Sequence, residues 1–189
     1  MNFSETVAYL RAQDAELVSD VVEDRGDPFV VVPAASVARV AELLRDGADT
    51  QLDQLSLVSG VDYPDRGEME VVYHFDSIAK ATPFTMKAIV SRDDARVPTL
   101  CGLYSTADWH EREVYDLSGV TFEGHPNLVR ILCVDDWVGH PLRRDYVWPE
   151  EYHGIPCGPF AGDGVNIPPD WEIEDGDDFV FTTKKGAKA

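Results

Sequence analysis

The stretch EMEVVYHFDSIAKATPFTMKAIVSR, residues 68–92, decides the fold class. Apolar residues recur at every second position in its first part, 68–76, and again in its last part, 84–92. A period of two is typical of β-strands that bury one face and leave the other polar. Such strands favour a mostly antiparallel sheet with helices packed on its apolar side. The residues expected on the buried face are Met69, Val71, Tyr73, Phe75, Phe84, Met86, Ala88 and Val90.

The flanking sequence predicts the helices that cover this sheet, because its apolar residues recur with helical spacing. Ser4 is expected to cap the first helix, and Gly47 to end the second. Together the elements predict an α+β fold: a mixed, mostly antiparallel sheet packed on helices, followed by a long extended irregular C-terminal tail. The expected helices are 4–13, 33–47 and one or two within 97–119, and the expected strands are a hairpin of 16–24 with 28–32 and a further strand at 52–63.

The pattern changes at residue 120, beyond which proline and glycine are frequent and little periodicity remains. A long stretch of this kind is usually disordered or wrapped on a partner. The part up to residue 160 is too apolar for simple disorder. We therefore predict three regions: an α+β domain at 1–119, an extended partner-wrapping segment at 120–160, and an acidic tail, free in solution, at 161–189.

The charge balance excludes two classes of partner. The chain of 189 residues carries 35 acidic residues against 16 lysines and arginines, a formal net charge of −19. A nucleic-acid-binding protein needs clustered basic residues to neutralise phosphates, so we exclude nucleic acid as a partner. The same excess of acid disfavours direct docking on an anionic lipid surface. A basic protein partner is compatible with it.

Cysteine usage and the N-terminus indicate a protein of a reducing compartment. Cys101, Cys133 and Cys157 form no Cys-x-x-Cys pair. Their number and spacing disfavour a disulfide framework, an iron–sulfur cluster or a structural zinc site. The first 17 residues contain acids and no apolar stretch, so we expect no signal peptide, and no run is long enough to span a bilayer.

The helix predicted within 97–119 carries HEREV at 110–114, which contains candidate metal ligands. Its histidine and second glutamate could share a metal, but the His-Glu-x-x-His zinc pattern fails because valine occupies position 114. Arg112 has Asp108 and Asp116 four residues to either side. That spacing favours an ion-pair ladder on the helix surface, so we interpret the group as structural.

The segment GHPNLVRILCVDDWVGHPLRRDY, residues 124–146, contains Gly-His-Pro twice, and we call it the signature segment. Glycine permits a sharp bend, and proline pushes the preceding histidine into an extended conformation. Each repeat could therefore present a rigid imidazole ring to a neighbour. A metal site formed by the two histidines with Asp135 or Asp136 has suitable residue types, but it matches no compact ligand spacing.

Arginines and aromatic residues make the signature segment a candidate interface. Arginine and tryptophan are favoured anchors of protein interfaces, and arginine can form two-pronged bonds to carboxylates. Two interpretations stay open, contacts with a partner or internal pairing with nearby aspartates, and both can hold. The residues concerned are Arg130, Arg143 and Arg144, with Trp137 and Tyr146, and the aspartates are Asp135, Asp136 and Asp145.

Residues 108–146 resemble the 30-kDa subunit family of NADH-quinone oxidoreductase, the C subunit of respiratory complex I. Beyond Tyr146 the sequence departs from the family pattern, and Arg144 stands where lysine is common. The matching motifs are EREVYD at 111–116, GVTFEGHP at 119–126, RIL at 130–132, DW at 136–137 and GHPLRRDY at 139–146.

The resemblance implies a non-catalytic structural subunit in the peripheral arm of the proton-translocating complex. It would support electron transfer from NADH to quinone without an active site in this chain. The complex uses NADH, FMN, iron–sulfur clusters and quinone, and the chain itself is expected to bind no cofactor and no metal. The implied partners are the 49-kDa-type D subunit and the neighbouring iron–sulfur subunits B and I. The implied location is the cytoplasmic side of the plasma membrane, reached only through the complex.

The resemblance also selects the expected partner-interface residues, and two alternatives to it remain. One is an equivalent scaffold subunit of a membrane-bound hydrogenase or formate hydrogenlyase related to complex I. The other is a stand-alone metallohydrolase using His110, His125 and His140. The expected interface residues are Glu111, Arg112, Glu113, His125, Arg130, Trp137, His140, Arg143, Arg144 and Tyr146.

Overall fold

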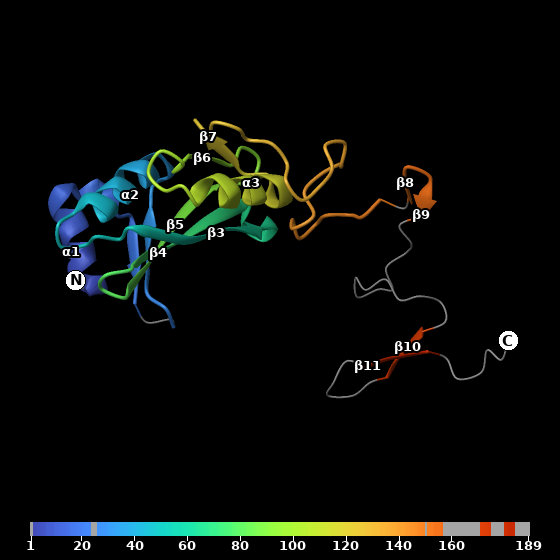
Figure 1. Ribbon diagram of the computed structural model, residues 1–189, viewed down its shortest axis with the longest axis horizontal. Helices are drawn as coiled ribbons and strands as arrows, with labels where there is room; N and C mark the ends of the chain where they lie inside the picture. The colour runs from blue at the N-terminus through green and yellow to red at the C-terminus, as the bar shows by residue number, and fades with distance from the viewer. Residues whose placement is uncertain (1, 24–25, 150, 157–170, 175–179, 184–189) are drawn as a thin grey trace. The chain divides into compact units, whose positions relative to one another are not determined.

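The structure, a computed structural model, describes residues 2–23, 26–149, 151–156, 171–174 and 180–183 (Figure 1). The chain divides into two compact units, Met1–Tyr146 and Val147–Ala189, which are described separately below. No helix of the described residues is long and apolar enough to cross a membrane.

A five-stranded sheet forms the centre of the first unit, with the strand order β1-β2-β5-β4-β3. All neighbours pair antiparallel except β2 and β5, which are parallel. The predicted α+β fold with a mixed, mostly antiparallel sheet is therefore confirmed. The strands are β1 (Asp20–Val22), β2 (Phe29–Val32), β3 (Gln54–Tyr63), β4 (Glu68–Ser77) and β5 (Thr82–Ser91).

Three α-helices accompany the sheet, and the helical spacing predicted all three. The first is capped by Asn2, whose side chain accepts from the Glu5 N–H while the Glu5 carboxylate accepts from Asn2 N–H, so the predicted cap at Ser4 was wrong. Helix α2 ends at its expected cap, Gly47. The helices are α1 (Phe3–Gln13), α2 (Val37–Asp46) and α3 (Ala107–Ser118), and short 3₁₀ turns occupy η1 (Ala15–Leu17), η2 (Ala34–Ser36) and η3 (Pro64–Arg66).

Short strands that the sequence did not predict frame helix α3. Strands β6 (Arg96–Pro98) and β7 (Thr121–Glu123) pair in parallel, one before the helix and one after it. Three residues are too few to show a period of two, so the pair is invisible to pattern analysis. It brings together the chain segments that precede and follow α3, and it places the start of the signature segment directly after β7. Strands of the second unit are β8 (Glu151–Tyr152), β9 (Ile155–Pro156), β10 (Trp171–Glu174) and β11 (Val180–Thr183).

The signature segment belongs to the first unit, since residues 120–146 pack with the α+β fold. Apart from β7, this region of the chain has turns and bends and no regular element. The predicted wrapping of a partner by residues 120–160 stays a prediction, because it concerns a second chain. Much of the predicted acidic tail at 161–189 lies outside the described residues.

The core lies between the sheet and the helices, and helix α3 comes close to the backbone of β3 at Gly60. All eight residues expected on the inner face of β4 and β5 belong to this core or pack against it. A Cβ atom on Gly60 would lie 2.9 Å from Val114 Cγ1 and 3.0 Å from Ser118 Oγ. Helix α3 therefore rests directly on the backbone of β3, which places the end of the helix and the signature segment beside the sheet edge.

Replacing Gly60→Ala is expected to lower the free energy of unfolding by about 1–3 kcal/mol, because the added methyl group overpacks the contact between α3 and β3. Urea denaturation of the full chain measures the effect. The matched control is Gly102→Ala, since a Cβ at Gly102 meets nothing within 4 Å. That variant should change the stability by less than about 1 kcal/mol. Equal losses in both variants would contradict the close packing at Gly60.

Candidate functional site

Asp116 of helix α3 organises the signature segment, although its carboxylate is completely buried. Oδ2 accepts the backbone N–H groups of Ile131, Leu132 and Cys133 at 3.1, 2.8 and 2.8 Å, and Oδ1 pairs with Arg130 at 2.8 Å. Burial alone would raise the pKa of Asp116, but these four donors lower it below its ordinary value. The charged carboxylate is therefore the form that holds the segment.

The C-terminal end of α3 is closed by the same segment. The last carbonyls of an α-helix have no partner within the helix and carry partial negative charge. Gly119, in the left-handed conformation with φ 79°, turns the chain away at this point. Each of the last three carbonyls then accepts a bond of 2.9 Å: Asp116 from His140 Nδ1, Leu117 from Leu142 N–H, and Ser118 from Arg143 Nε.

The two Gly-His-Pro histidines both bond to the backbone of α3, in opposite tautomers. His140 donates from Nδ1 to the helix end. Burial lowers its pKa, and Arg143 and Arg130 lower it further, which keeps the ring neutral. The fully buried ring of His125 accepts the Asn127 N–H at Nδ1 and so donates from Nε2 to the Asp108 carbonyl at 3.2 Å. The expected presentation of these rings to a neighbouring chain stays a prediction, because within this chain they hold the helix.

Space at the helix end is tight enough to require glycine. A Cβ atom on Gly119 would lie 2.5 Å from His140 Cδ2 and 2.7 Å from Arg143 Nη2. The positive φ and the close contacts together explain why the chain has glycine where the helix meets the signature segment.

Arg112 of helix α3 holds the signature segment through hydrogen bonds to its backbone carbonyls. Its guanidinium donates to the carbonyls of Val129 and Arg130 at 3.1 and 3.4 Å, and it lies over the ring of Trp109 at 5.0 Å from the centroid. The predicted ion-pair ladder with Asp108 and Asp116 was wrong. The acid at 116 is turned inward and pairs with Arg130, which leaves Arg112 to bind backbone carbonyls.

The far end of the segment is fixed to the sheet through Asp62. This buried carboxylate pairs with Arg92 at 2.7 Å and accepts the backbone N–H of Arg144 at 2.9 Å, and Arg92 also pairs with Asp145. Burial alone would raise the pKa of Asp62, but Arg92 and the Arg144 N–H lower it. Both ends of the segment from Arg130 onward are therefore anchored to buried aspartates of the same fold.

The structure thus shows internal pairing of one signature arginine, with a partner that the sequence did not propose. Arg130 pairs with Asp116, and the exposed Asp145 pairs with Arg92. Asp62 and Arg92 were missed, because they lie far from the motif in sequence. The other predicted interface residues divide by exposure: Glu111 is buried; Arg112, His125, Arg130, Trp137, His140, Arg143 and Tyr146 are half-buried; and Glu113 and Arg144 are exposed.

The anchored segment leaves apolar side chains facing outward. Of the 11 large hydrophobic residues that are exposed among the described residues, five lie between 129 and 142. Leu132 is 63% exposed although its backbone N–H is bonded to Asp116, and Val138 is 82% exposed although its carbonyl accepts the Tyr146 hydroxyl at 3.1 Å. Exposed apolar residues gathered in one short segment make that segment a candidate protein-binding surface. We call these five residues the outer face of the segment: Val129, Leu132, Val134, Val138 and Leu142.

One cluster of metal-type ligands occurs among the described residues, and its atoms are already hydrogen-bonded. Donor atoms of Cys101, Glu111 and His125 lie within 4.8 Å of one another. Both ring nitrogens of the histidine serve backbone groups, and burial raises the pKa of the Cys101 thiol to about 11. Glu111 accepts from Thr99 Oγ1 and Leu100 N–H. The cluster therefore acts as a structural hydrogen-bond centre between α3 and the loop before it.

Among the described residues, His110, His125 and His140 do not lie together in a cluster of possible metal ligands. The remote alternative of a three-histidine metallohydrolase consequently has no geometric support.

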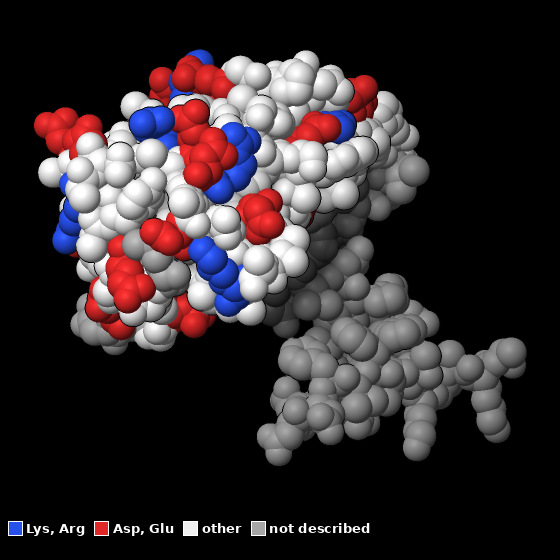
Figure 2. Space-filling model, turned by 60° about the vertical axis from the view of Figure 1, so that its left-hand side comes forward, with Lys and Arg blue, Asp and Glu red and all other residues white. Residues whose placement is uncertain are grey.

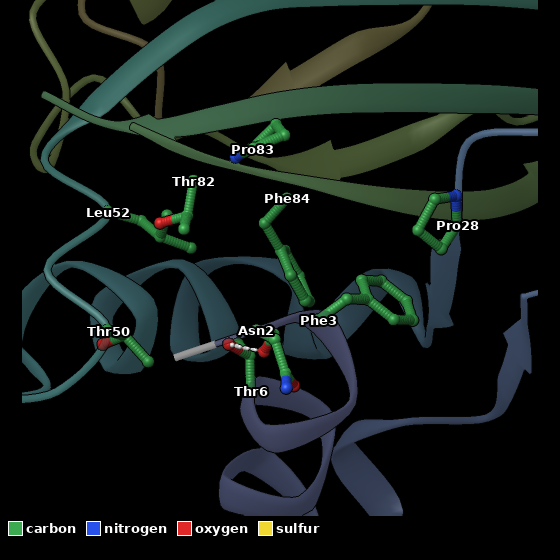
Figure 3. A pocket seen from close by; sticks show the side chains of 9 residues that line it. All are labelled: Asn2, Phe3, Thr6, Pro28, Thr50, Leu52, Thr82, Pro83 and Phe84. Carbon is green, nitrogen blue, oxygen red and sulfur yellow. Dashed lines mark hydrogen bonds between the residues drawn. The ribbon is translucent and has the colours of Figure 1, made fainter. Parts of the chain in front are cut away.

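A separate cavity of about 270 Å³ lies beside the N-terminal helix (Figure 3). The rings of Phe3 and Phe84 stack in its wall with centroids 5.4 Å apart. Its lining contains no charged residue, histidine or cysteine. It therefore lacks the acids, bases and nucleophiles of a catalytic site other than threonine hydroxyls. The lining residues are Asn2, Phe3, Thr6, Pro28, Thr50, Leu52, Thr82, Pro83 and Phe84.

Replacing Asp116→Asn is expected to lower the free energy of unfolding by about 3 kcal/mol, because Arg130 loses its counter-charge and an amide group cannot accept from every donor. Urea denaturation of the full chain gives the value. Asp135→Asn, at an exposed acid of the same segment, is the matched control and should stay within about 0.5 kcal/mol of wild type. A small, equal effect of both changes would contradict the anchoring role of Asp116.

The two buried carboxyls of α3 are expected to give opposite pH dependences. The pKa of Asp116 is lowered by folding, so its stabilisation is present above the unfolded value of 3.8 and is lost as the pH falls through the folded value. Burial raises the pKa of Glu111 above its ordinary value of 4.5. Its contribution to the stability of the folded chain is therefore present at lower pH and is lost as the pH rises from 4.5 through the higher folded value.

The free energies of unfolding of wild type, Asp116→Asn and Glu111→Gln, measured between about pH 3 and pH 7, check the direction of both pH dependences. The loss caused by Asp116→Asn should shrink toward acid. The advantage of wild type over Glu111→Gln should shrink toward neutral pH. Parallel trends for the two variants would contradict the assignment.

Known proteins are similar to this chain over most of its length. The family profile described as Respiratory-chain NADH dehydrogenase, 30 Kd subunit, matches residues 30–152. The C subunit of NADH-quinone oxidoreductase from Chloroherpeton thalassium is 42% identical over 148 residues, covering 77% of this chain and 61% of the relative. The corresponding C subunit from Citrifermentans bemidjiense is 41% identical over 141 residues, covering 74% of this chain and 86% of the relative.

A solved structure gives a further likeness. A chain of the membrane-bound sulfane sulfur reductase, an archaeal respiratory membrane complex, aligns with a TM-score of 0.64 and 26% identity, covering 76% of this chain and 85% of that chain. This chain spans about three fifths of the length of the first relatives it matches. The profile match confirms the resemblance recognised in residues 108–146: the chain belongs to the 30-kDa subunit family of respiratory-chain NADH dehydrogenase, which includes the C subunits of bacterial NADH-quinone oxidoreductases.

Proposed function

We propose that the chain is a non-catalytic structural subunit in the peripheral arm of a proton-translocating NADH-quinone oxidoreductase. Membership of the 30-kDa subunit family supports the assignment to this complex. The single observation that carries the structural role is the outer face of the signature segment, whose apolar side chains are exposed on a backbone fixed by Asp116 and Asp62.

The physical advantage of this arrangement is preorganisation. A segment without regular structure normally loses conformational entropy when it binds, which weakens the complex. Here the bonds to α3 and to the sheet restrain the segment before a partner arrives. Burial of Leu132 and Val138, which are 63% and 82% exposed, then contributes to association with less ordering cost.

The partners in this proposal are the 49-kDa-type D subunit and the iron–sulfur subunits B and I, and the location is the cytoplasmic side of the membrane. The chain would reach the membrane only through these partners, which agrees with the absence of a spanning helix among its described residues. On the face seen in Figure 2, lysines and arginines form small separate groups among acidic residues, which offers no extended basic surface for anionic lipid.

In this proposal the redox groups of the complex, FMN and the iron–sulfur clusters, are bound by other subunits, as are NADH and quinone. The hydrogen-bonded state of the cluster at Cys101, Glu111 and His125 supports this, because its donor atoms already serve the fold. The chain's contribution to electron transfer is then to hold its neighbours in position.

The second candidate is the equivalent scaffold subunit of a related complex, such as a membrane-bound hydrogenase or a formate hydrogenlyase. The likeness to a chain of the archaeal sulfane sulfur reductase complex, at 26% identity, supports this second candidate. Identities of 41–42% to C subunits of NADH-quinone oxidoreductase favour the NADH-linked complex. Affinity purification of the full chain from its native membrane decides between them, since the NADH-linked assembly oxidises NADH and reduces quinone.

The double variant Leu132→Asp with Val138→Asp is expected to reduce co-purification of the assembly by at least about tenfold, because two charges would have to be buried in an apolar contact. Ile78→Asp is the control, since Ile78 is 72% exposed in the turn between β4 and β5. Quantitative mass spectrometry of the purified material measures the yield. Full recovery of the assembly with the double variant would show that the outer face is not the interface.

A further inference from the structure

We infer that the free edge of strand β3 pairs with an extended segment of a partner subunit, which adds a sixth strand to the sheet. The inference rests on the proposed function, because it requires the chain to work within an assembly. Strand β3 is the last strand in the order β1-β2-β5-β4-β3. Among the described residues its backbone bonds to β4 on one side and, at the Leu55 carbonyl, to the hydroxyl of Thr106.

The length and composition of β3 are unusual for an edge that stays open to water. It has ten residues, and its first eight, QLSLVSGV at 54–61, carry no charge in a chain with a net charge of −19. Soluble proteins protect exposed edges with lysine, proline, β-bulges or very short strands, because the unpaired backbone groups would otherwise pair with another chain. The register shift between Leu55 and Leu57 is such a bulge, but it lies near one end of β3, and pairing with β4 continues without a break from Leu57 to Tyr63.

A hollow of about 110 Å³ lies next to this edge, between β3 and α3. Leu57, Leu117 and Leu142 line it, and the first and last are 42% and 61% exposed. An apolar cavity of about 150 Å³ can hold a benzene ring, so this smaller hollow suits a single aliphatic side chain. Strand addition uses this combination: the backbone supplies hydrogen bonds and adjacent pockets receive side chains.

The charge beside the hollow indicates the chemistry of the added segment. Glu113 lines the hollow and is exposed, and it forms no ion pair with any described residue. A complementary segment would therefore carry a lysine or arginine near its apolar side chain. A second copy of β3 offers no base, since QLSLVSGVDY contains none. The charge thus favours a different polypeptide over pairing of two identical edges.

Leu142 connects this edge to the outer face of the signature segment, because it belongs to both. A partner that covers the outer face would extend onto the hollow without a gap. The two surfaces then form one continuous interface around the end of α3.

Amide hydrogen exchange of the full chain, alone and within the affinity-purified assembly, tests the inference. About every second amide of β3 points away from β4 and should exchange rapidly in the isolated chain. We expect these amides to exchange at least about tenfold more slowly in the assembly, since a new strand would bond to them. Equal exchange in both states would overturn the inference and leave the proposed function standing. Protection that appears in the isolated chain and grows with its concentration would overturn it in favour of self-pairing.

Variants provide the second measurement. Leu57→Lys and Glu113→Lys are expected to reduce recovery of the assembly by about tenfold each, by blocking the hollow and by reversing its charge. Ile78→Lys is the matched control and should recover it fully. Circular dichroism confirms that each variant is folded. Full recovery with both hollow variants would overturn the inference, whereas loss of the assembly with the control as well would count against the proposed function itself.

Discussion

A single buried carboxylate, that of Asp116, determines where the irregular part of the first unit lies. An unpaired charge cannot be buried without a large cost, so the carboxylate needs strong donors from its own chain. It obtains them from three successive backbone N–H groups, Ile131 to Cys133, and from Arg130. The last carbonyls of α3 need hydrogen-bond donors, and His140, Leu142 and Arg143 of the same segment supply them. The helix and the segment therefore stabilise each other.

This mutual arrangement explains how a segment without regular secondary structure can hold the apolar surface that we propose for binding. Several polar groups of the signature segment bond inward to α3 and to Asp62, and the five apolar side chains of its outer face, Leu132 and Val138 among them, remain exposed. Gly60 brings α3 onto β3, so the anchored segment lies next to the open edge of the sheet. Within the described residues, the fold thus places a restrained apolar surface beside the strand edge at β3, which supports the proposed role of holding other polypeptides in position.

The sequence predicted what depends on periodicity and missed what depends on distant pairing. Alternation located β4 and β5, and helical spacing found α1, α2 and α3, because one-sided burial leaves a regular trace. The parallel pairing of β2 with β5 leaves no such trace, and β6 and β7 are too short to show one. Within the candidate site, the motif located the segment, but Arg112 and Asp116 were given the wrong partners. Spacing of four residues suggests a surface ion pair, and only the fold reveals that the acid at 116 points into the core. Asp62 and Arg92 lie outside the motif, so their role required the structure.

Hydrogen exchange of the isolated chain, followed residue by residue by NMR, tests most directly whether the signature segment is held by its own helix. The amides of Ile131, Leu132, Cys133 and Leu142 are bonded to α3 and have no need of a partner. They should exchange at least about a hundredfold more slowly than in an unfolded peptide. Exchange at unfolded rates in the isolated chain, with protection gained only inside an assembly, would show that the partner and not Asp116 gives the segment its shape.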